Sequence, residues 1–241
     1  MFSNHWFYKI CLFIFLIFSG VANAEIIIHG TRVVYPSDAR EITLEVTNEG
    51  ENPALVQVWI DEGDADSTPD QSKAPFVITP PIARVEAQKG QFLRISSLPT
   101  ANALSKDQET LFWLNILDIP PKPNSKNMSA APDSFLQLAI RSRIKLFYRP
   151  SSIKEDANLA PGKIQWTNNG KVLVIKNPTP FYITMSAIAQ QNLGEKVDIL
   201  REGLMLSPFS EKSVTLLNSN VQGMTFTTIN DYGGSVTNDI K

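Results

Sequence analysis

A long alternating segment in the middle of the chain places the strongest limit on its fold. Leucine and isoleucine recur at every second position, interrupted once by Ser142, at Leu136, Leu138, Ile140, Ile144 and Leu146. A period of two puts these side chains on one face of a β-strand and the polar ones between them on the other. At about 3.3 Å per residue the segment spans roughly 40 Å, well beyond an ordinary strand. The pattern predicts a strand that either closes its own sheet or offers part of its length to another protein.

The remainder of the chain also has the pattern of β-strands. Short runs of β-branched and aromatic residues alternate with clusters of proline, glycine, asparagine and aspartate. The predicted strands are 25–35, 41–48, 54–61, 76–79, 82–85, 91–96, 110–117 and 135–148, followed by 163–167, 171–176, 181–189, 197–206, 213–217 and 224–229. Residues 149–159, which lie between these two groups of strands, are polar and begin with Arg149-Pro150. We therefore predict an all-β protein with sandwiches at 25–149 and 150–241.

One turn in the second half carries a specific signal. The pair Asn169-Gly170 lies between two predicted strands. It predicts a hairpin with a type I′ turn, which needs positive φ at both central positions.

Residues 1–24 have the layout of a secretory signal peptide. Lys9 precedes an apolar run at positions 10–18, and Ala22-Asn23-Ala24 forms a small-residue cleavage site. A membrane anchor is the alternative, but a spanning helix needs about 20 apolar residues and this run is shorter. We expect cleavage after Ala24 and export of residues 25–241.

Composition excludes several classes of function. Removing residues 1–24 takes away Cys11, the one cysteine, together with Lys9, and changes the net charge from −2 to −3. Such a balance gives no reason to expect nucleic acid or an acidic membrane surface as partner. With His29 as the one histidine after residue 24, thiol catalysis and zinc sites are excluded. No glycine-rich phosphate loop and no nucleophile elbow is present, so we expect neither an enzyme nor a bound cofactor.

Several motifs, in order along the chain, resemble those of one known family. They are Gly30-Thr31-Arg32-Val33-Val34-Tyr35-Pro36, Thr79-Pro80-Pro81, Glu109-Thr110-Leu111-Phe112-Trp113-Leu114-Asn115, Ile119-Pro120-Pro121, the stretch 144–150 and Ile229-Asn230-Asp231-Tyr232-Gly233-Gly234. Their order and spacing over nearly the whole mature chain resemble the periplasmic pilus chaperones of the bacterial chaperone–usher pathway.

The resemblance implies two immunoglobulin-like sandwiches set at an angle with a cleft between them. It implies a chaperone that lends a strand to an incomplete pilus subunit and delivers the subunit to an outer-membrane usher, without inserting into a membrane. By position, the donated apolar residues are Leu136, Leu138 and Ile140. Arg32 and Lys145 match two basic residues that bind the C-terminal carboxylate of the subunit. Glu109, Arg149 and Asp231 match a charge cluster between the domains.

Two features depart from the simplest form of this family. The loop at 122–135 is longer than in short-loop chaperones, yet the mature chain lacks the cysteine pair usual in long-loop chaperones, so both subclasses stay open. An apolar edge strand also favours self-association of the free protein.

Other interpretations are a two-sandwich surface protein, such as a pilin-like subunit or adhesin, and a carbohydrate-binding or hydrolytic sandwich. The acidic run 61–66 lacks the ligand spacing of a calcium loop, and we expect it to be an exposed acidic loop.

Overall fold

The computed structural model describes residues 26–121, 137–192 and 194–240. The predicted signal peptide, the loop at 122–135 and Leu136 therefore lie outside the described residues. Within the described ranges the structure is built from β-strands and short 3-10 helices. No helix in these ranges is long and apolar enough to cross a membrane.

The N-terminal unit is a sandwich of two sheets. One sheet has the order β1-β3-β7-β5, formed by β1 (Ile26–Ile28), β3 (Ile42–Asn48), β7 (Lys89–Ser97) and β5 (Phe76–Thr79). The other has the order β2-β9-β8-β4-β6, formed by β2 (Arg32–Pro36), β9 (Ile140–Arg149), β8 (Thr110–Ile119), β4 (Ala54–Asp61) and β6 (Ile82–Val85). Two 3-10 helices, η1 (Pro69–Gln71) and η2 (Pro99–Ala103), lie in connections. Buried side chains such as Tyr35, Leu93 and Leu146 fill the space between the sheets.

The predicted strand at 25–35 is two strands instead of one. It breaks at Gly30, whose φ of 139° is a backbone conformation that other residues rarely adopt. β1 pairs antiparallel with β3, whereas β2 pairs parallel with β9 in the opposite sheet. The chain therefore changes sheets at the break, and this brings Arg32 next to Lys145 on adjacent strands.

The C-terminal unit has its own core and two sheets. One contains β10 (Gln165–Asn169), β11 (Val172–Lys176) and β15 (Glu211–Thr215). The other contains β12 (Ile183–Asn192), β13 (Glu195–Asp198), β14 (Leu204–Leu206), β16 (Thr225–Ile229) and β17 (Ser235–Asp239). Its core, which includes Phe181, Met185 and Phe226, shares no residue with the N-terminal core. Each unit thus buries a hydrophobic centre of its own.

Three details of this unit differ from the sequence predictions. The hairpin at Gly170 forms, but Asn169 pairs with Val172 within the strands and only Gly170 has positive φ, which fits a type II′ turn and not type I′. The predicted strand at 197–206 is divided into β13 and β14, because the chain bends between them. β17 and the 3-10 helix η4 (Ala157–Lys163) were not predicted, since neither has a run of alternating apolar residues.

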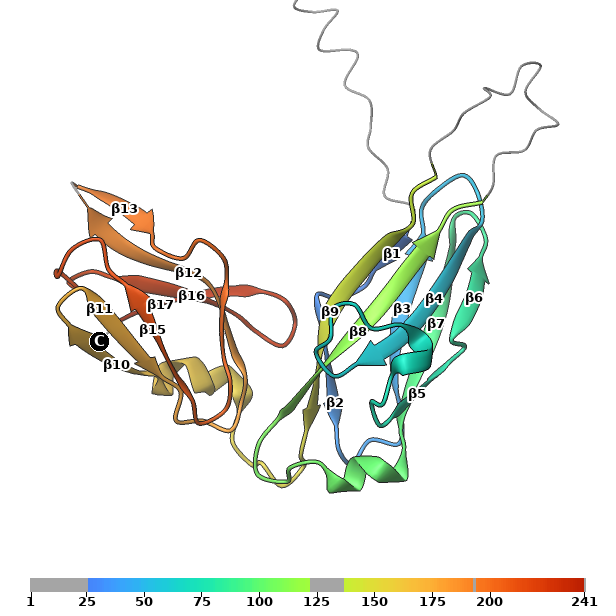
Figure 1. Cartoon of the computed structure of the whole chain (residues 1–241), viewed down its shortest axis with the longest axis horizontal. Helices are drawn as coiled ribbons and strands as arrows, with labels where there is room; N and C mark the ends of the chain where they lie inside the picture. Colours follow the sequence, from blue (N-terminus) through green and yellow to red (C-terminus); the bar gives the residue numbers. More distant parts are fainter. Residues whose placement is uncertain (1–25, 122–136, 193, 241) are drawn as a thin grey trace, which may run out of the picture.

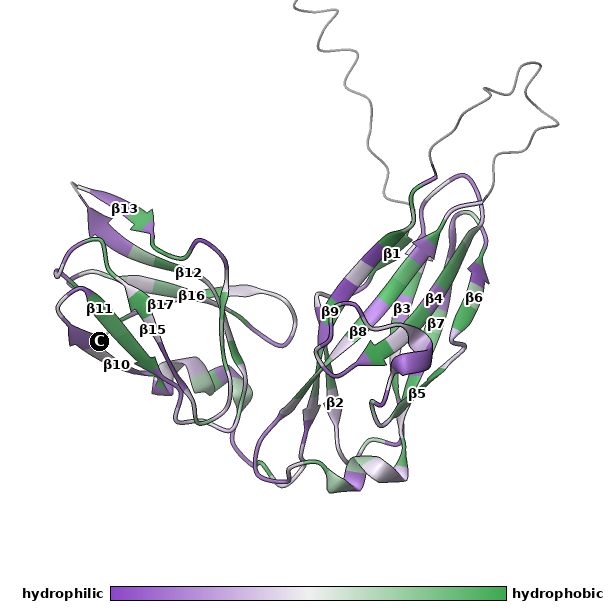
Figure 2. Cartoon of the chain, in the orientation of Figure 1, coloured by the Kyte–Doolittle hydropathy of each residue, from purple (hydrophilic) through white to green (hydrophobic). Residues whose placement is uncertain are grey.

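The two units lie side by side, joined by the segment that follows β9 (Figure 1). Figure 2 shows hydrophobic residues along strands such as β4 and β11, whereas the short helix η1 is hydrophilic. The units contact each other through β2, β9 and the turn before β8 on one side, and through β12 and β16 on the other. On the N-terminal side these contacts are made by charged residues, namely Arg32, Lys145 and Glu109.

Candidate functional site

The exposed part of β9 is the first element of the site. β2 pairs with β9 at residues 145–149 only, so within the described ranges residues 140–144 pair with β8 alone. We call residues 140–144 the open-edge segment. On the apolar face, the exposed fraction is 63% at Leu138 and 64% at Ile140, whereas Leu146 is fully buried. Ile144 is partly buried against the core. One face of the long alternation therefore closes the sandwich at one end and is exposed at the other.

The strand itself is shorter than predicted. It begins at Ile140, and residues 137–139 precede it without strand structure. Leu138 thus lies just outside β9, and Leu136 lies outside the described residues. Within the described ranges the pairing of β9 with β8 begins at Ile140, so the alternating sequence alone does not extend the strand to residues 137–139.

Arg32 and Lys145 both reach from the N-terminal unit to the C-terminal unit. Arg32 Nη1 donates a hydrogen bond to the carbonyl oxygen of Ile229 at 2.9 Å. Lys145 Nζ donates to Thr184 Oγ1 at 3.3 Å. Burial lowers the pKa of both side chains, and the charge of Arg32 lowers that of Lys145 further. Two partly desolvated cations on neighbouring strands form a positive site between the units.

Arg149 joins two carboxylates at the same junction. Its Nε contacts Glu109 Oε1 at 2.7 Å, and its two Nη atoms contact Asp231 at 2.7 and 3.0 Å. Glu109 is almost fully buried, and its Oε2 also accepts a hydrogen bond from the backbone N–H of Tyr182 at 2.8 Å. Asp231 and Tyr182 belong to the C-terminal unit. The structure therefore brings together the three charges that the sequence placed far apart.

The electrostatics of this cluster reflect its burial. Burial raises the pKa of Glu109, an effect only partly opposed by Arg149. Although burial lowers the pKa of Arg149, the hydrogen bonds and charges of Asp231 and Glu109 raise it more. Arg149 is consequently a permanent cation held between two carboxylates.

A pocket of about 390 Å³ lies beside these charges. Its lining includes Arg32 and Arg149 from one unit and Phe181, Tyr182, Ile229 and Asp231 from the other. It shows that residues of both units converge on one concave surface.

Several contact residues had no signal in the sequence. The predicted charges contact Thr184 and Ile229, which are ordinary strand residues, and Tyr182, which directly precedes β12; only the packing of the two units identifies them. The expectation for the acidic run was wrong at one position. Residues 62–66 are exposed, but Asp61 is buried at the end of β4 because Arg143 and Asn115 pair with it. No cluster of potential metal ligands occurs in the described part of the chain.

Comparison with known proteins shows the class to which this fold belongs. Residues 25–154 match the model of the pili and flagellar-assembly chaperone PapD N-terminal domain, and residues 159–240 match the model of its C-terminal domain. The chain is 44% identical over 231 residues to the chaperone protein MrkB of Klebsiella pneumoniae, covering 95% of this chain and 96% of that one.

Solved structures agree. The CupB2 chaperone of Pseudomonas aeruginosa has a TM-score of 0.74 at 37% identity, covering 88% of this chain and 97% of its own. The SafB chaperone of Salmonella enterica, solved in complex with the SafA pilin, has a TM-score of 0.72 at 28% identity, covering 92% and 99%. The fold and site thus define a two-domain, all-β assembly chaperone. The chain belongs to the pili-assembly chaperone family.

Proposed function

We propose that this protein is a periplasmic chaperone that binds, folds and caps pilus subunits and passes them to an outer-membrane usher. The open-edge segment of β9 carries this proposal, because one side of its backbone is not paired by β2 and because Ile140, together with the preceding Leu138, exposes an apolar side chain. A subunit sandwich that lacks one strand would pair with this edge, take β9 as the missing strand and bury its apolar residues. The SafB chaperone, which is similar over nearly the whole chain, was solved with a pilin bound.

The apolar contribution to binding comes from Leu138 and Ile140, with Leu136 as the third donated residue by resemblance. Both described side chains are more than 60% exposed. Burying a leucine or isoleucine side chain contributes about 1.5–3 kcal/mol, and each main-chain hydrogen bond adds about 0.5–1.5 kcal/mol. These are gross contributions, from which the cost of ordering a subunit strand is subtracted.

The C-terminal carboxylate of the subunit would bind at Arg32 and Lys145. Both cations are partly desolvated, and each makes one hydrogen bond to a neutral group of the C-terminal unit. An arriving carboxylate would neutralise two neighbouring positive charges and form charge-assisted hydrogen bonds. Because it fixes the end of the subunit strand, this anchor also sets the register of pairing along β9.

The cluster of Arg149, Glu109 and Asp231 would hold the two units at a fixed angle, so that the anchor and the donated edge face the same subunit. We assign it no catalytic role, and the proposed cycle needs no cofactor: the next subunit displaces β9 by strand exchange. A chaperone that acts in the periplasm must be exported. The predicted signal peptide at 1–24 would direct this export and would be cleaved after Ala24.

The test is subunit capture by purified protein. A pilus subunit from the same host is co-expressed with tagged chaperone, either wild type, Ile140→Arg or Phe92→Arg. Phe92 is the matched control because it is also an exposed apolar strand residue, but on the other sheet. We expect wild type and Phe92→Arg to yield a one-to-one complex and Ile140→Arg to yield free, folded chaperone. Normal complex formation by Ile140→Arg would refute the proposed role of β9.

A further inference from the structure

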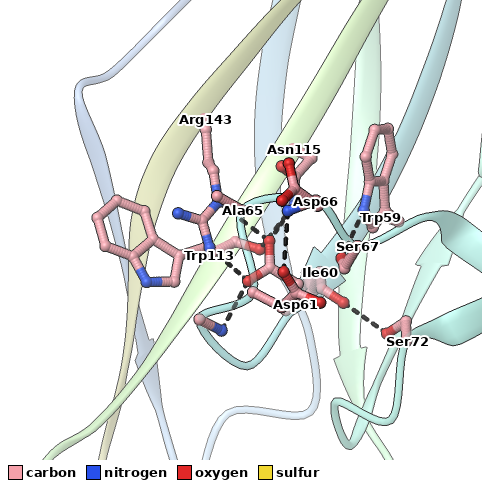
Figure 3. Close-up of polar contacts among 12 residues, drawn as sticks. Trp59, Ile60, Asp61, Ala65, Asp66, Ser67, Ser72, Trp113, Asn115 and Arg143 are labelled. Atoms are coloured by element: carbon pink, nitrogen blue, oxygen red, sulfur yellow. Dashed lines mark hydrogen bonds and ion pairs between the residues drawn. The ribbon is translucent and has the colours of Figure 1, made fainter.

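Arg143 connects three strands across the face of the sheet opposite the core. It lies on β9, and its guanidinium reaches past β8 to Asp61 at the end of β4 (Figure 3). The contact is bidentate, with Nη2 to Oδ1 at 2.6 Å and Nε to Oδ2 at 3.1 Å. Paired planar groups of this kind are among the stronger and more directional ion pairs in proteins.

Asp61 is built to receive this guanidinium. Its side chain is 2% exposed, and the other donors to it are the backbone N–H of Gly63 at 2.7 Å and Asn115 Nδ2 at 2.7 Å. Two donors therefore reach each carboxylate oxygen, which satisfies the carboxylate fully. A carboxylate held by Asn115 of β8 and by Gly63 of the loop after β4 offers a rigid attachment point for β9.

Two tryptophans complete the arrangement. The guanidinium of Arg143 lies 4.3 Å from the ring centre of Trp113, and the Lys145 ammonium lies 5.8 Å from the same ring. Arg141, the next residue on this face of β9, lies over Trp59 and also donates to the carbonyl oxygen of Ala65. Cations over indole faces add attraction without requiring burial of the charge. The polar face of the open-edge segment is thus attached to its own sheet at two successive positions.

Both attached arginines lie within the open-edge segment itself. Arg141 and Arg143 alternate with Ile140, Ser142 and Ile144, so the attached face and the apolar face belong to the same five residues. β2 does not pair with this segment, and β8 holds it from one side. A strand supported on one side loses order more readily than one in the middle of a sheet.

We propose that the Arg143–Asp61 pair, stacked on Trp113, is a positioning clamp. It holds residues 140–144 extended before a subunit arrives. This inference rests on the function proposed above and adds residues to it: Arg143 does not touch the subunit but orders the strand that does. A strand ordered in advance spares binding part of the entropy cost of fixing it, so the clamp raises the rate of productive encounters.

The first test needs no subunit. Hydrogen–deuterium exchange of the free protein is measured at amides of residues 140–144 in wild type, Arg143→Met, Arg143→Lys and the control Arg84→Met. The control removes an arginine of the same domain whose ion pair with Glu86 is exposed. We expect exchange at least tenfold faster in Arg143→Met, an intermediate value in Arg143→Lys and no change in the control. Unchanged exchange in Arg143→Met would overturn the clamp.

A second variant covers the case in which Arg143→Met unfolds the domain. The double variant Asp61→Asn/Arg143→Met removes both charges, so no unpaired carboxylate stays buried, yet the clamp is still absent. Faster exchange confined to residues 140–144, with the unfolding midpoint retained, supports positioning. If exchange rises equally in β3 and β7, the Arg143–Asp61 pair stabilises the whole domain and does not specifically position β9, which overturns the proposal.

The second test measures binding kinetics with a purified pilus subunit. If the clamp increases the ordered fraction, its loss lowers the association rate constant about tenfold and leaves dissociation of the formed complex unchanged. Faster dissociation with unchanged association would show that Arg143 contacts the subunit directly, which overturns the positioning role. Failure of wild type to bind any subunit would refute the proposed function, whereas the exchange result on the free strand would still stand.

Discussion

Replacing Arg149 by methionine probes the charge cluster between the two units. Methionine keeps much of the apolar stem of arginine but leaves Glu109 without its ion-pair partner. The Glu109 side chain is 1% exposed, while Asp231 is 25% exposed. The two carboxylates should therefore respond differently to the loss of the guanidinium.

The expected magnitude follows from this difference in burial. Removing one partner of a buried ion pair costs about 3–5 kcal/mol, because the remaining charge stays desolvated. The partly exposed contact to Asp231 contributes about 0–1 kcal/mol. We thus expect Arg149→Met to lower the free energy of unfolding by about 3–5 kcal/mol. In the double variant Arg149→Met/Glu109→Gln the unpaired charge is gone, and about 2 kcal/mol should be recovered, because an unpaired buried amide costs about 1–3 kcal/mol and an unpaired buried charge about 3–5 kcal/mol.

The assay is urea unfolding at neutral pH, followed by circular dichroism and tryptophan fluorescence, with the Arg84→Met control. Acid provides a second check on the same reasoning. In the wild type burial raises the pKa of Glu109 and Arg149 lowers it, so loss of Arg149 should raise this pKa further and make the folded variant bind the proton more tightly than the folded wild type does. The deficit of Arg149→Met should therefore shrink as the pH falls from about 7 towards about 5. A double variant no more stable than the single one would refute the argument from buried charge.

Three further predictions follow from the structure. Lys145→Ala should weaken subunit binding at least tenfold by calorimetry while the unfolding midpoint is retained, and a subunit lacking its terminal carboxylate should not distinguish the two proteins. For Asp61, burial raises the pKa, but hydrogen bonds from Arg143 and others lower it more, to below 3.8. Its stabilisation, present above that pH, should be lost as the pH falls through the folded pKa, so acid unfolding of wild type and Asp61→Asn should converge. Gly233→Ala should disturb the junction of the units, because φ is +84° and the new Cβ would lie 2.5 Å from Thr31 Oγ1; identical small-angle scattering would contradict this.

Much of the N-terminal sandwich could be predicted because its signals are local. The limits of β4, β5 and β6 agree with the predicted ranges, since each is a short β-branched run bounded by turn residues. The long alternation correctly indicated a strand with one apolar face. Alternation reports only that one face avoids water, however, and it is the same whether the covering layer belongs to this chain or to another. The resemblance to the chaperone family, and not the period, identified which end is exposed.

The remaining features depend on distant parts of the chain. The change of sheets at Gly30 was not predicted, because a flexible residue marks a possible break without showing where each half pairs. Asp61 was grouped with an exposed loop, since the arginine that buries it lies 82 residues away.

The amino-acid sequence was sufficient to predict the class of fold, two β-sandwiches, and its motifs indicated the family and the charged residues of the site. These properties follow from local periodicity, turn chemistry and the identity of single residues. Which of these groups meet is seen only in the folded protein. Arg149 contacts Glu109 and Asp231. Lys145 donates a hydrogen bond to Thr184. Arg143 of β9 pairs with Asp61 of β4. Burial and pairing of charges depend on the relative placement of strands far apart in the chain, and no local pattern encodes that placement.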